Sequence, residues 1–197
     1  MRIIGITGGI GAGKSTVLTL LEQDYHAYIL EADKVAHVLM EPGQPVFQQI
    51  VEVFSEQILD AEGRIDRGRL GELVFRSPEW LERLNHIVHP EVKRYILEAI
   101  SRCRQTGDVD YFVIEAALLI EDGYTAICDE IWYIHVPREL RIQRLMLGRG
   151  RSREHWERVM ENQAADSFYR DHCSRVIENQ GSISDIKKQI RELLKNT

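Results

Sequence analysis

The chain is short of positive charge, and this limits the partners that it can have. Of its 197 residues, 25 are Lys or Arg and 31 are Asp or Glu, which gives a formal net charge of −6. Proteins that bind nucleic acids or anionic membranes usually carry a basic field, so the sequence predicts neither partner. Any site for phosphate must therefore be local.

Cysteines and long apolar runs are also scarce. Cys103, Cys128 and Cys173 are far apart without a Cys-x-x-Cys pair, which predicts reduced thiols and neither zinc nor disulfides. The amino-terminal apolar stretch, residues 2–7, is too short for a signal peptide or a membrane span, so a cytoplasmic protein is expected. Repeats and Pro/Ser-rich linkers are missing, so any subdomain must be an insertion. Nothing in the sequence indicates an oligomeric state.

Short apolar runs alternate with helical patterns, which is typical of an α/β fold with a doubly wound sheet. The candidate strands are residues 2–7, 27–30, 111–114, 131–136 and, more weakly, 175–177. They predict a five-stranded parallel sheet flanked by helices, one of them an amphipathic terminal helix over residues 183–194.

The long stretch between the second and third strands looks helical. Ser77-Pro78 predicts a helix start there, because serine caps and proline suits the first turn. Pro90 predicts a break or kink after His89, so two helices are expected to share one apolar stripe. That stripe consists of Leu81, Leu84, Val88, Val92, Tyr95 and Ala99.

Residues 8–15 fit the pattern G-x-x-x-x-G-K-[ST] at every fixed position, between a predicted strand and a predicted helix. Glycines let successive backbone N–H groups turn around phosphate oxygens, and the helix that follows aims its positive end at them. The residues expected to bind the nucleotide are therefore Gly9, Gly11, Ala12, Gly13, Lys14, Ser15 and Thr16.

Three side chains of this loop have expected roles towards ATP·Mg²⁺. Lys14 reaches the β- and γ-phosphates and assists catalysis, and the Ser15 hydroxyl is the predicted magnesium ligand. Thr16 is expected at the α-phosphate. The loop alone does not name the reaction, because motors, switches and kinases all carry it.

Asp33 directly follows the second strand, which places it at the carboxyl edge of the sheet where open α/β sheets bind ligands. A carboxylate there can accept the proton of an attacking hydroxyl or orient it. The alternative is a helix N-cap, and spacing alone does not decide between the two.

Positive charge is concentrated between Arg138 and Arg158, a segment that contains seven arginines and three glutamates. Glycines beside arginines predict a lid that closes over ATP and brings guanidinium groups to the transferred phosphoryl. The alternative is a solvated, salt-bridged helix pair.

Two acidic groups raise further possibilities. Glu82, His86 and His89 lie at helical spacings of four and three, which raises the hypothesis of a metal site on one face of a helix. Against it, no further metal ligand is evident, and histidines on helices are more often structural. Glu115 ends the third strand, where it either holds a magnesium-bound water or caps the next segment.

Several separate stretches resemble the dephospho-coenzyme A kinase family and together span nearly the whole chain. They are residues 5–15, the Ala-Asp segment at 32–36, residues 63–67 with Leu70 and 74–75, residues 84–90, Gln163 and the tail 176–181. The resemblance implies that ATP, assisted by Mg²⁺, phosphorylates the ribose 3′-hydroxyl of dephospho-CoA, the last step of coenzyme A synthesis. It makes Asp33 the catalytic base.

The resemblance also implies a division of the chain. A P-loop kinase core takes residues 1–41 and 107–197, with an arginine-bearing lid at about 145–165, and a helical acceptor-binding subdomain takes 42–106. Arg144 fits the lid pattern as a catalytic arginine. The next expected arginine falls on Gly148, which leaves Arg149 or Arg151, and we assign Arg149 to the nucleotide. Ala117 stands where the family usually has proline.

Two other functions compete with this interpretation. One is a kinase for a different small acceptor, built on the same core. The other is a nucleotide switch, for which the only sign is the Asp-x-x-Gly form of residues 60–63, and this stretch follows a helical pattern instead of a strand.

Overall fold

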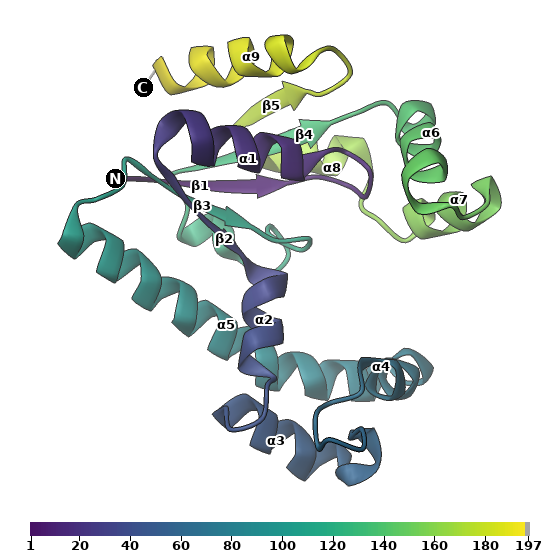
Figure 1. The fold of residues 1–197 in the computed structure, drawn as a ribbon. Coiled ribbons are helices and arrows are strands. Elements are labelled where there is room, and N and C mark those ends of the chain that lie inside the picture. Colours follow the sequence, from purple (N-terminus) through teal and green to yellow (C-terminus); the bar gives the residue numbers. More distant parts are fainter. Residues whose placement is uncertain (196–197) are drawn as a thin grey trace. The chain divides into compact units, whose positions relative to one another are not determined.

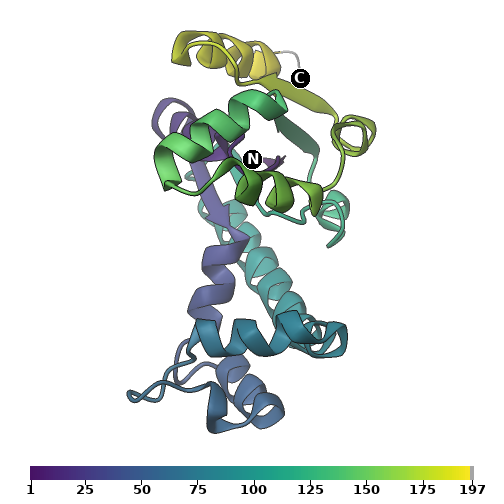
Figure 2. The same ribbon diagram turned by 90° about the vertical axis from the view of Figure 1, so that its right-hand side faces the viewer.

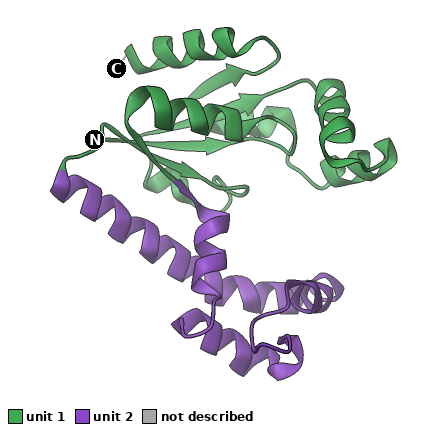
Figure 3. Cartoon of the chain, in the orientation of Figure 1, with its two compact units in different colours: residues 1–29, 107–197 green, residues 30–106 purple. Residues whose placement is uncertain are grey.

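The structure of the protein is a computed structural model that describes residues 1–195 (Figure 1). The chain forms two compact units (Figure 3), one of residues 1–29 with the chain from Gly107 onward, and one of residues 30–106. The segment predicted as an insertion, residues 42–106, lies inside the second unit.

A five-stranded parallel sheet organises the chain, as the sequence predicted. Its strands are β1 (Arg2–Thr7), β2 (Ala27–Glu31), β3 (Tyr111–Glu115), β4 (Glu130–His135) and β5 (Arg175–Glu178), in the order β2-β3-β1-β4-β5. β1 pairs in parallel with both β3 and β4, and β4 pairs in parallel with β5. Because β1 is central, the loop that leaves it stands between the carboxyl ends of β3 and β4, where ligands of α/β sheets bind.

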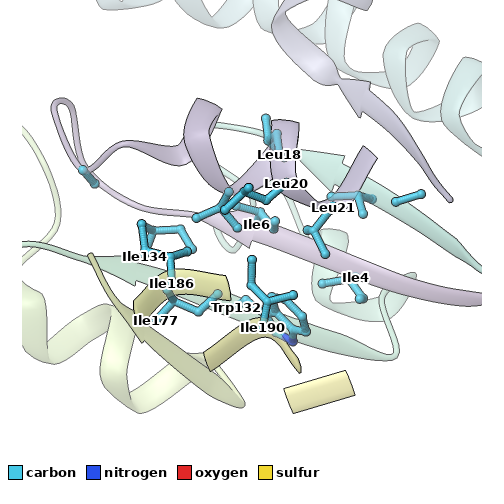
Figure 4. Close-up of a cluster of buried hydrophobic side chains, with 14 residues drawn as sticks. Ile4, Ile6, Leu18, Leu20, Leu21, Trp132, Ile134, Ile177, Ile186 and Ile190 are labelled. Carbon is cyan, nitrogen blue, oxygen red and sulfur yellow. The ribbon is translucent and has the colours of Figure 1, made fainter. Parts of the chain in front are cut away.

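Helices cover both faces of the sheet in the first unit. They are α1 (Lys14–Tyr25), η2 (Tyr124–Ala126), α6 (Arg138–Arg149), α7 (Arg153–Glu161), α8 (Asp166–His172) and α9 (Ile183–Lys195). Leu21 of α1 and Ile190 of α9 pack in one buried cluster with Trp132 of β4 (Figure 4). Side chains alternate along a strand, so the neighbouring Tyr133 points to the opposite face. There its ring stacks on Tyr169 of α8, with centroids 4.8 Å apart.

The second unit is helical. It contains α2 (Ala32–Leu39), α3 (Pro45–Phe54), η1 (Glu56–Ile58), α4 (Arg67–Arg76) and α5 (Pro78–Thr106). α5 starts at the predicted Pro78, but the predicted break at Pro90 is wrong, since the helix runs through it. Pro90 is exposed, so water can satisfy the carbonyl that loses its partner, while Val88, Val92 and Ile96 remain buried on the inner face.

Two predictions from composition can be compared with the structure. Cys103, Cys128 and Cys173 are all free, and burial raises the pKa of both Cys128 and Cys173 to about 12, which keeps these thiols protonated at neutral pH. Within residues 1–195, the helices are too short or too polar to cross a bilayer.

Candidate active site

The loop between β1 and α1 is tight, and its glycines are needed for packing. Gly11 and Gly13 have φ angles of 77° and 80°, in the left-handed region that other residues rarely adopt. A Cβ on Gly13 would collide with the side-chain amide of Asn179, and one on Gly9 would collide with the guanidinium of Arg141. The glycines therefore let this chain's own side chains approach the loop, in addition to any ligand.

Several backbone N–H groups of the loop are free to bind an anion. Those of Gly11, Gly13, Lys14 and Ser15 have no acceptor among residues 1–195, whereas that of Ala12 bonds to the Gly9 carbonyl at 3.1 Å. The free groups gather at the amino-terminal end of α1, where the helix dipole also favours negative charge. This part of the chain therefore fits the phosphates of a nucleotide.

Lys14 is held at this loop by two contacts. Its ammonium donates to the Gly8 carbonyl at 2.9 Å and lies 3.3 Å from Oε1 of Glu115, which is buried at the end of β3. Only 19% of its side chain is exposed. The positive charge is thus positioned beside the free N–H groups before any ligand arrives, and Glu115 serves as its counter-charge.

Ser15 and Thr16 are the next residues of α1. Ser15 is exposed and Thr16 half-buried, and neither side chain has a hydrogen bond within residues 1–195. No group of three or more His, Cys, Asp or Glu side chains in the same residues could hold a metal ion. The Ser15 hydroxyl, together with oxygens of a bound ligand, could hold Mg²⁺ at this loop, since Mg²⁺ beside phosphates often has only one or two protein ligands.

Side chains from the region of positive charge brace the outer side of the loop. Arg141 of α6 donates to the Ile10 carbonyl at 2.8 Å and to Oε1 of Gln163 at 2.6 Å. The same Gln163 oxygen accepts from the Ile10 N–H at 3.1 Å. Burial lowers the pKa of the Arg141 guanidinium from its ordinary value.

α6 and α7 form a helix pair, which Figure 2 shows side by side. Ile142 and Leu145 of α6 pack on Trp156 and Met160 of α7. Arg153 links the helices through Glu139, and it also bonds to Glu157 at 2.9 Å. The salt-bridged helix pair that stood as an alternative to the lid is therefore present, and the same pair supplies arginines to the loop.

The predicted lid arginines differ in their positions. Arg144 is half-buried, with Nη1 4.0 Å from the point that a Cβ on Gly13 would occupy, so it lies close to the loop. The side chains of Arg149 and Arg151 are exposed and have no hydrogen bond or ion pair within residues 1–195. Arg149 is also about 7.5 Å further along α6 than Arg144, at 1.5 Å per residue.

Asp33 belongs to the second unit, as the second residue of α2. The alternative role as an N-cap is wrong, because the N-cap residue is Glu31. The Asp33 carboxylate is exposed and has no partner among residues 1–195, and its place in the first turn favours its negative charge. It is therefore available to a ligand.

The other two acidic stretches have structural explanations. Asp60, which starts the switch-like sequence, accepts hydrogen bonds from the backbone N–H groups of Glu62 and Arg64 at 3.0 and 2.9 Å. It thus stabilises a reverse turn. Nδ1 of His86 lies 2.9 Å from the Glu82 carbonyl oxygen of its own helix, and residues 1–195 contain no cluster of three or more His, Cys, Asp or Glu side chains that could hold a metal ion there.

Comparison with known proteins identifies the family. The family model of dephospho-CoA kinase matches residues 2–185. The chain belongs to the dephospho-CoA kinase family. It is 40% identical to the dephospho-CoA kinase of Corynebacterium diphtheriae over 193 residues, covering 98% of this chain and 96% of that protein. It is 42% identical to the dephospho-CoA kinase of Carboxydothermus hydrogenoformans over 154 residues, covering 78% and 74%.

A solved structure supports the same fold. The crystal structure of TT1252 from Thermus thermophilus superimposes with a TM-score of 0.84 at 34% identity, covering 99% of this chain and 97% of that one. The dephospho-CoA kinase from Campylobacter jejuni superimposes with a TM-score of 0.71 at 26% identity, covering 100% of this chain and 97% of that one. This member of the dephospho-CoA kinase family therefore has the P-loop kinase core that the sequence predicted.

Sequence reasoning missed two residues that hold the loop of this dephospho-CoA kinase family member. In the sequence, Arg141 is one of seven arginines between residues 138 and 158 with nothing to distinguish its role, and Asn179 belongs to the family-like tail 176–181. The Asn179 amide, 5% exposed, donates to the Ala12 carbonyl at 2.8 Å across 167 residues of sequence. No local pattern marks such a contact.

We expect Asn179→Ala to loosen the loop and destabilise the protein. The buried Ala12 carbonyl would lose its donor, which costs about 1–3 kcal/mol of unfolding free energy. Urea denaturation measures this change, and a raised KM for ATP would accompany it. The matched control is Asn162→Ala, which also removes an amide bonded to a backbone carbonyl, but at an exposed site. It should cost no more than about 0.5 kcal/mol; equal losses in both variants would contradict the role given to Asn179.

Proposed function

We propose that the chain transfers the γ-phosphoryl group of ATP to the ribose 3′-hydroxyl of dephospho-CoA in the cytoplasm, giving coenzyme A and ADP, the last step of coenzyme A biosynthesis. The observation that carries the proposal is the set of unpaired N–H groups at Gly11, Gly13, Lys14 and Ser15, beside the Lys14 ammonium. Family membership supports the choice of acceptor. We propose no nucleic-acid or membrane partner, in keeping with the net charge of −6.

The loop and its lysine would stabilise the charge that develops during transfer. Backbone N–H groups bind the phosphate oxygens, and Lys14 reaches the β- and γ-oxygens as a point charge. The Ser15 hydroxyl would hold Mg²⁺, which would supply positive charge to offset that of the phosphate oxygens. Arg144, which lies near Gly13, is the arginine that would meet the transferred group.

The remaining residues serve the acceptor and the lid. Asp33 would accept the proton of the 3′-hydroxyl or orient this group for attack. Residues 42–106 would hold the acceptor. The α6–α7 pair would act as the lid, with Arg149 or Arg151 turning to the nucleotide on closure, since both are unpaired within residues 1–195.

The test is acceptor-dependent ADP formation by the purified protein with ATP and Mg²⁺. Dephospho-CoA should stimulate ADP formation strongly, and phosphorus NMR of the product should show a new 3′-phosphomonoester. Activity with another small alcohol or nucleotide, and none with dephospho-CoA, would replace this proposal by the rival kinase. GTP selectivity without any acceptor effect would favour the switch.

A further inference from the structure

The second unit contains a polar pocket that none of the roles above uses. It has a volume of about 470 Å³ and lies between the end of α2 and the segment that runs from Asp60 into α4. Its lining includes His37, Met40, Glu41, Asp60, Arg64 and Arg67. The pocket is thus formed by two short segments of one unit.

Most carboxylates of the pocket are already satisfied. Asp60 accepts backbone N–H groups, chiefly that of Arg64, which holds the pKa of Asp60 below its usual value. Asp66, which also lines the pocket, caps α4 by accepting from Gly68 and Arg69 at 2.8 and 3.1 Å. These acidic groups are therefore committed to the local backbone and do not call for a cation.

The cationic groups are more available. Arg67 is exposed and makes no hydrogen bond or ion pair within residues 1–195. Arg64 pairs with Asp60 at 3.1 Å and with Glu62 at 3.4 Å, but 58% of its side chain is exposed, and such surface pairs are weak enough to exchange. The pocket thus offers an unpaired guanidinium and a second one that can be released, which suits a phosphate-containing ligand.

The pocket also lies along the same helix face as Asp33. His37 is four residues after Asp33 on α2, so both side chains project from one side of the helix, about 6 Å apart along its axis. Met40 and Glu41 continue this face towards the pocket. One helix turn is comparable to the separation between the 3′-oxygen of a ribose and the phosphorus on its own 5′-oxygen.

We propose that this pocket binds the 5′-diphosphate of the acceptor, with Arg67 as its principal contact and Arg64 and His37 beside it. The inference rests on the proposed function, because it takes Asp33 as the residue that meets the 3′-hydroxyl. The planar guanidinium of Arg67 can donate hydrogen bonds to two phosphate oxygens at once. Glu41 suits the N–H and O–H donors that flank the diphosphate in dephospho-CoA. Arg67 is then a specificity-determining residue that distinguishes dephospho-CoA from a bare nucleoside.

The test compares Arg67→Ala with wild type at saturating ATP. KM for dephospho-CoA should rise about 10- to 100-fold, since a charge-assisted bidentate contact is lost, while KM for ATP stays unchanged. Adenosine, which lacks the diphosphate, is used as a competitive inhibitor, and its inhibition constant should be the same in both proteins. Arg67→Lys, which keeps the charge without the planar fork, should give an intermediate KM.

The matched control is Arg76→Ala. Arg76 lies at the other end of α4, pairs with Glu72 and does not line the pocket. Its removal should leave KM for dephospho-CoA and KM for ATP unchanged. Thermal unfolding would verify that all variants are folded. Three results would overturn the inference alone. They are an unchanged KM for dephospho-CoA in Arg67→Ala, an equal rise of this KM in Arg76→Ala, and an inhibition constant of adenosine that rises in Arg67→Ala as much as KM for dephospho-CoA does. A wild-type protein without turnover of dephospho-CoA overturns the inference together with the proposed function.

Discussion

Asp33→Asn is expected to lower the turnover number about 100- to 10,000-fold, the usual contribution of a general base. The amide keeps the size of the carboxylate but cannot accept a proton from the attacking hydroxyl. The fold should be unaffected, because the Asp33 side chain is exposed and unpaired within residues 1–195 and is not the N-cap of α2. Steady-state kinetics gives the turnover number, and titration with an ATP analogue should give an unchanged dissociation constant.

A second Asp→Asn substitution separates this effect from a general loss of charge. Asp24 is also an exposed carboxylate, but it lies near the end of α1 and pairs with Lys187 at 2.8 Å. It is about 15 Å along the helix from Lys14, at 1.5 Å per residue. Asp24→Asn should keep near-normal turnover. If Asp33→Asn also turns over normally, Asp33 has no role in proton transfer.

Lys14→Ala is expected to lower the turnover number about 100- to 1,000-fold, or roughly 3–4 kcal/mol, because the charge on the β- and γ-oxygens loses the stabilisation that the Lys14 ammonium supplies. The side chain has little freedom before binding, since it is held by the Gly8 carbonyl and by Glu115. The charge is therefore preorganised, and its loss should affect the chemical step more than the binding of ATP. Single-turnover kinetics at saturating ATP measures that step.

The same contacts give Lys14 a structural role that needs its own control. Its removal leaves the buried Glu115 without this counter-charge, so stability is measured alongside activity. The matched variant is Lys187→Ala, which removes a half-buried lysine with a surface ion pair and should change neither property. A Lys14→Ala protein with an unchanged rate of phosphoryl transfer would contradict the catalytic assignment, whatever its stability.

The loop and the sheet could be predicted because their signals are local. Gly11 and Gly13 need positive φ angles, and the residues after them begin a helix, so consecutive residues describe the whole turn. Likewise, a parallel strand covered on both faces is apolar almost throughout, which identifies β1, β3 and β4. The edge strand β5, with Arg175 exposed and Glu178 at its end, gives only a weak signal. In both cases the chemistry of neighbouring residues fixes the local backbone.

Pro90 shows where local reasoning fails. Proline inside a helix normally costs about 3 kcal/mol, and of the break or kink that the sequence predicts there, the break does not occur. α5 runs through this position because its inner residues, including Val92 and Ile96, are buried against other helices of the second unit. Packing along the whole helix outweighs one lost hydrogen bond.

By itself, the sequence determined the family, the alternation of strands and helices, and the loop with its lysine. Only the tertiary structure decided which side chains hold that loop, because Arg141 and Gln163 reach Ile10 across 131 and 153 residues, and Asn179 reaches Ala12 across 167. It also decided that the turn at Asp60 joins α2 in lining a pocket. A backbone turn depends on neighbouring residues, whereas a contact across the chain depends on how all the intervening elements pack, and no local pattern records that.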